Sequence, residues 1–206
     1  MFDENWNQFE LRSNLPILLG EIIKIGILAL QGDVIEHLNA TKQAVKQLKI
    51  KCEIVEVRTK KELEGVDGLI IPGGESTALM KLLEREGMVE EIKKIKNIFG
   101  TCAGTILLSK INLNLMDIEV ERNAYGSQIE SFEKEVESKF GKLNGIFIRA
   151  PKIKSIGKNV QVIAKDNEEI IGVEEKVGDR SYLALTFHPE LEGTKFHEYF
   201  LQQCQH

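Results

Sequence analysis

The stretch Phe99–Leu108, FGTCAGTILL, decides the fold that this chain is expected to adopt. An apolar pair, Ile98-Phe99, runs into a turn of small residues, and the turn runs into an apolar stretch that favours a helix. Cys102 lies at the turn, where a strand-to-helix elbow lifts a nucleophile above the edge of a sheet. The start of the following helix would favour the thiolate form of the sulfur. The alternative is a buried structural cysteine beside a tight turn, because free cysteine is among the most buried residue types.

The segments before the elbow repeat the same strand–helix pattern. Ile22–Leu30 is a nearly continuous apolar run, as expected for a strand buried on both faces. A turn at Gln31-Gly32-Asp33 leads into a helix, for which Asp33 and Glu36 predict a capping box. The apolar residues of this helix fall on one face: Val34, Leu38, Val45 and Leu48. The next two strands are predicted at Cys52–Val57 and Gly68–Ile71. This alternation is typical of a parallel α/β sheet.

The rest of the chain supplies further helices and strands. Ser76 is expected to cap a helix that turns Leu79, Leu82 and Leu83 inward, and a second helix turns Val89, Ile92 and Ile95 inward. Beyond Leu115 the pattern is mixed, with a charged stretch at Glu130–Lys142. Strands are predicted at Gly145–Ile148, Val160–Ala164, Ile170–Val173 and Tyr182–Phe187, with a hairpin around Asp166-Asn167 and a closing amphipathic helix at Lys195–Gln203.

Composition excludes several classes of protein. The chain has 206 residues, of which 29% are charged, and a net charge of −5 with no basic run, so nothing favours a nucleic-acid partner. No apolar stretch approaches the roughly 20 residues that span a bilayer. Three widely separated cysteines argue against a disulfide scaffold or a zinc site and suit a reducing cytoplasm. We therefore expect a cytoplasmic protein with no metal, no cofactor and no membrane partner.

Residues 1–21 do not resemble the remainder of the chain. Acidic residues precede a short apolar patch, whereas a secretory signal has a basic start and a longer apolar core. The segment is expected to be a loosely ordered extension or an upstream-misassigned start. Because no internal repeat or convincing linker is present, residues 22–206 are predicted to form a single domain.

A glycine-rich turn follows the strand at Gly68–Ile71. Two glycines at a strand's C-terminal end let the backbone approach a ligand closely, and ligands of open α/β sheets bind at this edge. The backbone N–H groups of Gly74 and Ala103 are expected to share an oxyanion there. A Gly-Gly turn alone is weak evidence, and its value comes from its position one strand away in sequence from the Cys102 elbow.

A histidine at the end of the last strand turns the balance toward catalysis. His188 follows Tyr182–Phe187, and Glu190 can accept its second ring N–H and fix the tautomer. Cys102, His188 and Glu190 therefore form a predicted nucleophile–base–orienter set suited to amide hydrolysis. Arg122 and Arg149 are candidates for holding a carboxylate.

The remaining histidines and cysteines receive no catalytic role. His37 is interpreted as a solvated or flanking histidine, and His197 as a surface residue. Cys52 is interpreted as a core residue, and nothing is assigned to Cys204 or His206.

These residues carry a resemblance to a known family. Gly100–Gly104, GTCAG, and Phe187–Glu190, FHPE, resemble the class I (triad) glutamine amidotransferases. The segments that narrow the resemblance to the glutaminase subunits of pyridoxal 5′-phosphate synthase are Ile27–Gly32, Pro72–Thr77, Arg122–Gly126 and Phe147–Pro151. The resemblance covers about Lys24 to Gln203.

The resemblance implies a fold and an activity. The fold would be a three-layer, open, mostly parallel sheet of flavodoxin-like type, and the reaction hydrolysis of L-glutamine to glutamate and ammonia by Cys102, His188 and Glu190. By motif position, glutamine binding falls on Gly74, Glu75, Ser76, Arg122, Ile148 and Arg149. The ammonia would pass, within a hetero-oligomer, to a (β/α)₈-barrel synthase that combines it with ribose 5-phosphate and glyceraldehyde 3-phosphate. Docking of that synthase would complete the oxyanion site.

Departures and alternatives accompany this resemblance. Residues 1–21 are additional, the segments on either side of Cys102 are shorter than in many members, and Ser127 stands where a second arginine is common. One alternative is the glutaminase of another amidotransferase, such as that of imidazole glycerol phosphate synthase, which the Pro72–Ser76 and Phe147–Pro151 motifs disfavour. The others are a cysteine peptidase or small-molecule hydrolase on a similar fold, and a non-catalytic binding subunit.

Overall fold

The computed structural model describes residues 22–122 and 131–205. The expectations for residues 1–21, for Ser127 and for His206 lie outside the described residues. The described strands are β1 (Ile23–Leu28), β2 (Cys52–Val57), β3 (Gly68–Ile71), β4 (Asn97–Thr101), β5 (Ile118–Glu121), β6 (Ser131–Ser138), β7 (Gly141–Ile148), β8 (Lys152–Ile156), β9 (Val160–Asp166), β10 (Glu169–Val177) and β11 (Arg180–Leu185). The helices are α1 (Val34–Leu48), α2 (Ser76–Arg85), α3 (Val89–Ile92), α4 (Ala103–Leu108) and α5 (Lys195–Gln203), with 3-10 turns η2 (Lys60–Leu63) and η3 (Pro189–Leu191).

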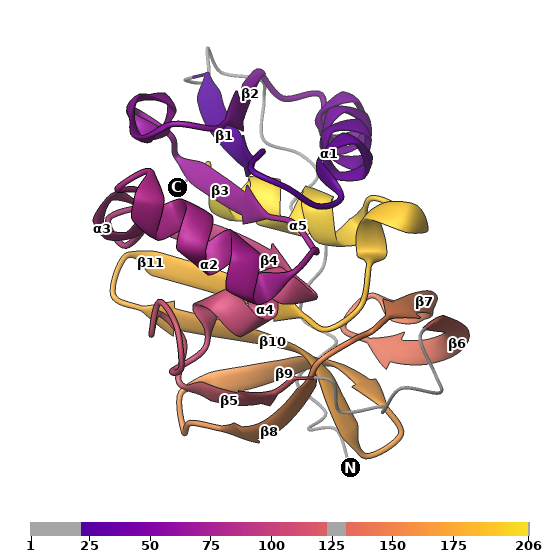
Figure 1. Ribbon diagram of the computed structural model, residues 1–206. Helices are drawn as coiled ribbons and strands as arrows, with labels where there is room; N and C mark the ends of the chain where they lie inside the picture. The colour runs from indigo at the N-terminus through magenta and orange to yellow at the C-terminus, as the bar shows by residue number, and fades with distance from the viewer. Residues whose placement is uncertain (1–21, 123–130, 206) are drawn as a thin grey trace.

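One large sheet organises the chain, with strand order β2-β1-β3-β4-β11-β10-β9-β6-β7 (Figure 1). Its first five strands run parallel. The other four are joined by antiparallel pairings, and the hairpin between β9 and β10 lies where the sequence predicts it. Strands β5 and β8 form a separate antiparallel pair. The predicted α/β architecture with a parallel central portion is confirmed.

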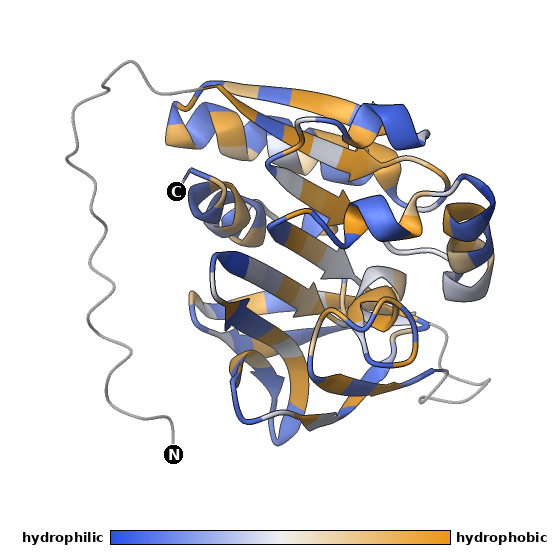
Figure 2. Cartoon of the chain, turned by 90° about the vertical axis from the view of Figure 1, so that its left-hand side faces the viewer, coloured by the Kyte–Doolittle hydropathy of each residue, from blue (hydrophilic) through white to orange (hydrophobic). Residues whose placement is uncertain are grey.

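Helices cover both faces of the parallel half. On one face, the buried cluster joins α2, α3 and α4 to β-strand residues such as Leu69 and Ile98. On the other face, α1 and α5 pack on Ile70 and Phe99. Neighbouring residues of one strand thus enter opposite cores, which explains the continuous apolar runs in the sequence. Figure 2 shows these apolar residues concentrated along the central strands.

The charged stretch Glu130–Lys142 contains a strand that the sequence analysis did not predict. In β6 most side chains are exposed, and only Val136 is fully buried. Because so few positions face the core, the period-2 signal of a half-buried strand is hidden by charge. Strands β5 and β8 were missed as well. No helix of the described residues is long and apolar enough to cross a membrane.

Two predicted helix caps are wrong. Asp33 stands at the N-cap position of α1, but its side chain makes no capping hydrogen bond. Its carboxylate instead lies 3.3 Å from Nδ1 of His188. Ser76 does not cap α2; Glu75 does, accepting hydrogen bonds from the backbone N–H groups of Thr77 and Ala78 at 3.0 and 2.7 Å. At α1 the expected capping side chain contacts His188 instead, and at α2 the residue before the expected cap takes its place.

Candidate active site

The C-terminal ends of the parallel strands bring the predicted residues to one edge. Cys102 follows β4, His188 follows β11, and the Gly73-Gly74 turn follows β3. Since β3, β4 and β11 are neighbours in the sheet, the segments that follow these three strands lie close together. The fold thus places Gly73 and His188, which are 115 positions apart in the sequence, side by side.

Cys102 occupies a strained elbow between β4 and α4. Its φ of 47° and ψ of −105° lie in a region that non-glycine residues rarely adopt. The backbone N–H of Cys102 donates to the carbonyl of Leu185 at 2.8 Å, and the Thr105 hydroxyl donates to the same carbonyl at 2.6 Å. Both bonds tie the elbow to the end of β11. The side chain is buried, and its thiol donates to the Ile148 carbonyl at 3.7 Å.

The glycines on either side of the elbow allow this close approach. A Cβ at Gly100 would lie 2.7 Å from the carbonyl carbon of Gly104. A Cβ at Gly104 would lie 2.2 Å from the carbonyl oxygen of Ile71, which is backbone and cannot move aside cheaply. The GTCAG motif is therefore a packing requirement of the turn as well as a frame for the cysteine.

Replacing Gly104 by alanine is expected to destabilise the fold by about 1–3 kcal/mol or more, the usual cost of overpacking a dense interior. The matched control is Gly193→Ala, because a Cβ at Gly193 meets no atom within 4 Å. Urea unfolding of the two variants measures the difference. Equal stability of the two would show that the elbow relaxes freely around the added methyl group.

His188 is buried and held by two carboxylates. Its Nδ1 lies 2.7 Å from Oε1 of Glu190 and 3.3 Å from Oδ2 of Asp33. Burial by itself lowers the pKa of His188, but the neighbouring side chains of Asp33, Cys102 and Glu190 and the charge of Glu190 outweigh it and raise that pKa well above its ordinary value. Its Nε2 has no hydrogen-bond partner within the described residues. The arrangement favours a protonated imidazole next to the thiol.

Asp33 is a residue of this site that the sequence analysis missed. The hydrogen bond with His188 holds the pKa of Asp33 below its usual value, against the opposing effect of burial. Gly73 makes room for this contact, since a Cβ there would lie 2.5 Å from Cε1 of His188 and 2.6 Å from Oδ2 of Asp33. The signal available in the sequence was the position of Asp33 in the turn that follows β1, at the same sheet edge.

Asp33, His188 and Glu190 also bring three ligand-type atoms within 4.8 Å of one another. Nδ1 of His188 already lies 2.7 Å from the Glu190 carboxylate, so a cation there would have to displace the shared proton. The geometry suits a proton-holding group better than a metal centre. The expected absence of metal and cofactor stays a prediction.

The glycine turn is braced from the neighbouring strand. The Gln31 side-chain amide donates to the Glu75 carbonyl at 2.6 Å. Gly32 packs against the carbonyl of Gly73 so closely that a Cβ would overlap it at 1.7 Å. Gly74 has a φ of 145°, which a glycine adopts without strain. The Gln-Gly pair after β1 therefore fixes the shape of the turn that carries the expected oxyanion donor.

The predicted glutamine-binding residues fall into two groups with separate contacts. Arg122 donates to Oε1 of Glu75 at 3.2 Å and to the Thr77 hydroxyl at 2.7 Å. The hydrogen bonds from the backbone of Thr77 and Ala78 lower the pKa of Glu75. In the second group, Ile148 reaches Cys102 through its carbonyl, and Arg149 has a positive φ of 43°.

Gly74 and Glu75 belong to the glycine turn, Arg122 contacts Glu75, and Ile148 contacts Cys102 with Arg149 next to it in the chain. Ser76, the first residue of α2, is buried. The binding role of these six residues stays a prediction.

Two histidines set aside in the sequence analysis are part of this region. His37 and His197 are both fully buried, so their interpretation as flanking or surface residues is wrong. Burial lowers the pKa of His37 well below its ordinary value and lowers that of His197 to about 3. Both rings are therefore neutral. Both rings make edge-to-face contacts with Phe99. Amphipathic spacing alone did not identify them as buried residues.

The other cysteines lie away from the site. Cys52 in β2 is half-buried and packs against the core, as expected in part. Cys204 is buried beside α5, and burial raises the pKa of both thiols. Neither has the electropositive surroundings that activate a nucleophile.

Comparison with known proteins adds independent information. A model of the SNO glutamine amidotransferase family matches residues 27–206. A protein of Methanocaldococcus jannaschii named pyridoxal 5′-phosphate synthase subunit PdxT is 50% identical over 191 residues, covering 87% of this chain and 97% of the relative. The protein of the same name from Methanothermobacter thermautotrophicus is 45% identical over 190 residues, covering 88% and 97%. A crystal structure described as a glutamine amidotransferase is 41% identical with a TM-score of 0.76, covering 87% of this chain and 98% of that one.

Proposed function

This chain belongs to the SNO glutamine amidotransferase family, and from that premise we propose that it hydrolyses L-glutamine to L-glutamate and ammonia. Cys102 is the proposed nucleophile, His188 the base and Glu190 the orienter. The observation that carries the proposal is the strained elbow, which presents a thiol beside a buried imidazole held by carboxylates. That combination stabilises a thiolate–imidazolium pair.

The proposed reaction proceeds in two halves. The Cys102 thiolate attacks the side-chain amide carbon of glutamine, and the carbonyl oxygen takes the negative charge. His188 then gives its proton to the departing nitrogen, so that ammonia leaves and a thioester remains. In the second half His188 takes a proton from water, the hydroxide attacks the thioester, and glutamate leaves as the thiol is restored. Positioned proton transfer contributes roughly 10²–10⁴-fold to such steps.

The oxyanion is proposed to bind the backbone N–H groups of Gly74 and Ala103. Ala103 supports this role as the first residue of α4, and Gly74 as part of the braced turn. Glu75, Ser76 and Arg122 are proposed to bind glutamine on one side. Ile148 and Arg149 are proposed to bind it on the other.

We further propose that the ammonia serves a partner subunit. The relatives that match nearly their whole length are named as subunits of pyridoxal 5′-phosphate synthase. The proposed partner is a (β/α)₈-barrel synthase in a hetero-oligomer, to which this chain would supply nitrogen for vitamin B6 biosynthesis.

Three further features belong to the proposal. A flavodoxin-like type is supported by the strand order 2-1-3-4 followed by the last parallel strand. Free cysteines in the described part of the chain support a cytoplasmic location. The single domain proposed for residues 22–206 is supported by one continuous sheet through its described parts.

A paired glutaminase assay tests substrate and partner together. Ammonia release from glutamine is expected to be faster with the synthase subunit than without it. The upper limit is roughly 10²–10³-fold, the change in kcat that one oxyanion-hole donor typically contributes. The reason is that a glycine at φ 145° can reorient its peptide when a partner docks. Equal rates with and without synthase would contradict partner activation, and no turnover of glutamine in either case would contradict the glutaminase.

A further inference from the structure

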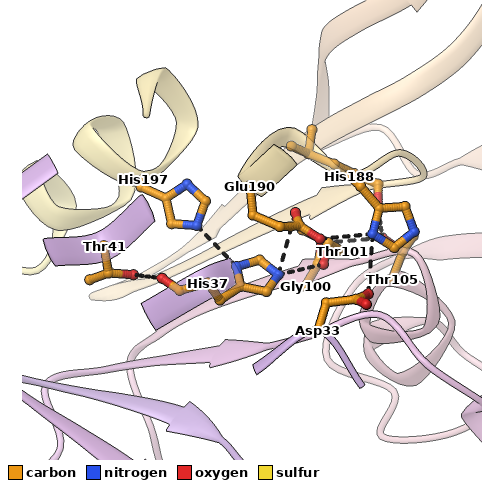
Figure 3. Close-up of polar contacts among 10 residues, drawn as sticks. Asp33, His37, Thr41, Gly100, Thr101, Thr105, His188, Glu190 and His197 are labelled. Carbon is orange, nitrogen blue, oxygen red and sulfur yellow. Dashed lines mark hydrogen bonds and ion pairs between the residues drawn. The ribbon is translucent and has the colours of Figure 1, made fainter. Parts of the chain in front are cut away.

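Two buried histidines extend the active-site hydrogen bonding beyond the triad. In Figure 3 the side chains of His197, His37, Glu190 and His188 lie in a row across the interior between α5, α1 and η3. Nε2 of His197 lies 3.0 Å from Nδ1 of His37. Nε2 of His37 lies 3.0 Å from the Thr101 hydroxyl and 3.4 Å from Oε2 of Glu190. Oε1 of the same carboxylate is the oxygen that faces His188.

The Glu190 carboxylate needs this second contact. Both Glu190 and His37 side chains are fully buried, and Oε2 accepts no hydrogen bond of ordinary geometry among the described residues, so its polar contact is Nε2 of His37 at 3.4 Å. Burial raises the pKa of Glu190, against the hydrogen bond and charge of His188. An N–H pointing at Oε2 would favour the ionised form that His188 requires.

The partners of each ring decide which nitrogen carries the proton. If His37 were protonated on Nδ1, its Nε2 lone pair would face the Glu190 carboxylate, and Nδ1 of His197 would be a buried donor without a partner among the described residues. With His37 protonated on Nε2, that N–H donates to the Thr101 hydroxyl and faces Oε2 of Glu190 at 3.4 Å, while Nδ1 accepts from His197. In this tautomer a proton rather than a lone pair faces the Glu190 carboxylate, and Nδ1 of His197 is an acceptor rather than a donor without a partner among the described residues, which is the cheaper deficit.

We propose that His37, protonated on Nε2 and held in that tautomer by His197, is a positioning residue that keeps Glu190 ionised and turned toward His188. The inference rests on the proposed glutaminase triad and deepens it. His37 touches neither substrate nor sulfur; it acts through Glu190. Thr101, whose hydroxyl accepts the Nε2–H of His37 in this tautomer, directly precedes the nucleophile in the chain. The two histidines are thereby connected to the elbow.

The titratable groups in printed contact with the triad come from several elements of the described chain. Asp33 and His37 come from α1 and the turn before it, Cys102 from the elbow, and His197 from α5. Because Asp33 is a second carboxylate on His188, loss of His37 should weaken the thiolate–imidazolium pair without abolishing it.

The tautomer can be read in the unmodified full-length protein. Histidine ¹⁵N chemical shifts are expected to show His37 and His197 neutral between pH 5 and 8, both protonated on Nε2. Protonation of His37 on Nδ1, or titration near its ordinary pKa of about 6.5, would overturn the proposal. The measurement needs no variant and no substrate.

Variants test the consequence for the thiol. His37→Leu removes the N–H, whereas His37→Gln keeps a donor at similar reach. With the synthase present, His37→Leu is expected to lower kcat about 10-fold or more, as for a hydrogen bond to a charged group, with KM for glutamine unchanged. The acid limb of Cys102 alkylation by iodoacetamide is expected to move upward by roughly one pH unit, because the imidazolium loses part of its counter-charge. His37→Gln should restore most of both quantities.

An unshifted alkylation limb in folded His37→Leu would overturn the proposal. If that variant does not fold, His197→Phe serves in its place, since it keeps the ring packing on Phe99 and removes the donor to His37. The same upward shift is expected there, and no shift would be contradictory. Alkylation and tautomer are independent of glutamine turnover, so failure of the glutaminase proposal is distinguishable from failure of this one.

Discussion

Cys102→Ala is expected to abolish the release of ammonia from glutamine in the presence of the synthase subunit, with a loss of at least about 10³-fold in kcat. Alanine removes the atom that forms the thioester and leaves no substitute, since the neighbouring Thr101 hydroxyl is bonded to His37. The fold should persist, because alanine is smaller than cysteine and the hydrogen bond from the sulfur to the Ile148 carbonyl is long, at 3.7 Å. Initial rates of ammonia release at saturating glutamine measure the effect.

Cys52→Ala is the matched control for that loss. Cys52 is a half-buried thiol of β2, at the far edge of the parallel half of the sheet, and it is expected to leave the rate unchanged. Near wild-type activity in Cys102→Ala would refute the assignment of the nucleophile, whatever the control shows.

Glu190→Gln is expected to lower kcat by about 10²–10⁴-fold while the side-chain volume stays the same. The amide can still accept the Nδ1–H of His188 but carries no charge, so the pKa of His188 falls and the thiolate loses its counterion. The remaining Asp33 carboxylate, 3.3 Å from Nδ1, should place the loss toward the smaller end of that range. A rate profile between pH 5 and 9 measures both changes.

Glu192→Gln controls for a change of charge near the site. The Glu192 side chain is exposed, and within the described residues its one hydrogen bond comes from the Asn144 amide. Its replacement is expected to leave kcat unchanged. The double variant Asp33→Asn with Glu190→Gln should fall further than Glu190→Gln alone. Equal rates of the single and double variants would show that Asp33 does not stabilise the His188 imidazolium.

The local pattern of the sequence was enough to predict the parallel half of the fold. The apolar runs of β1, β3 and β4 and the glycine turns after them are set by neighbours within a few residues, and the structure confirms these strands. Strand β6 failed because its charged, exposed side chains hide the single fully buried residue, Val136. Which side chains of a strand are exposed depends on the elements that pack against it, and the sequence of the β6 segment does not contain that information.

The same division holds for the site. The order of Cys102, His188 and Glu190 along strand ends already indicates a triad, because parallel strands place their C-terminal ends at one edge.

The partners of Asp33, His37 and His197 depended on α1 and α5 packing on the same face of the sheet. His37 and His197 are 160 residues apart, and their side chains are polar groups in an apolar interior. No local spacing distinguishes such a pair from two solvated histidines. Only tertiary packing, by removing water from both rings, made their hydrogen bond to each other obligatory and placed His37 3.4 Å from Glu190.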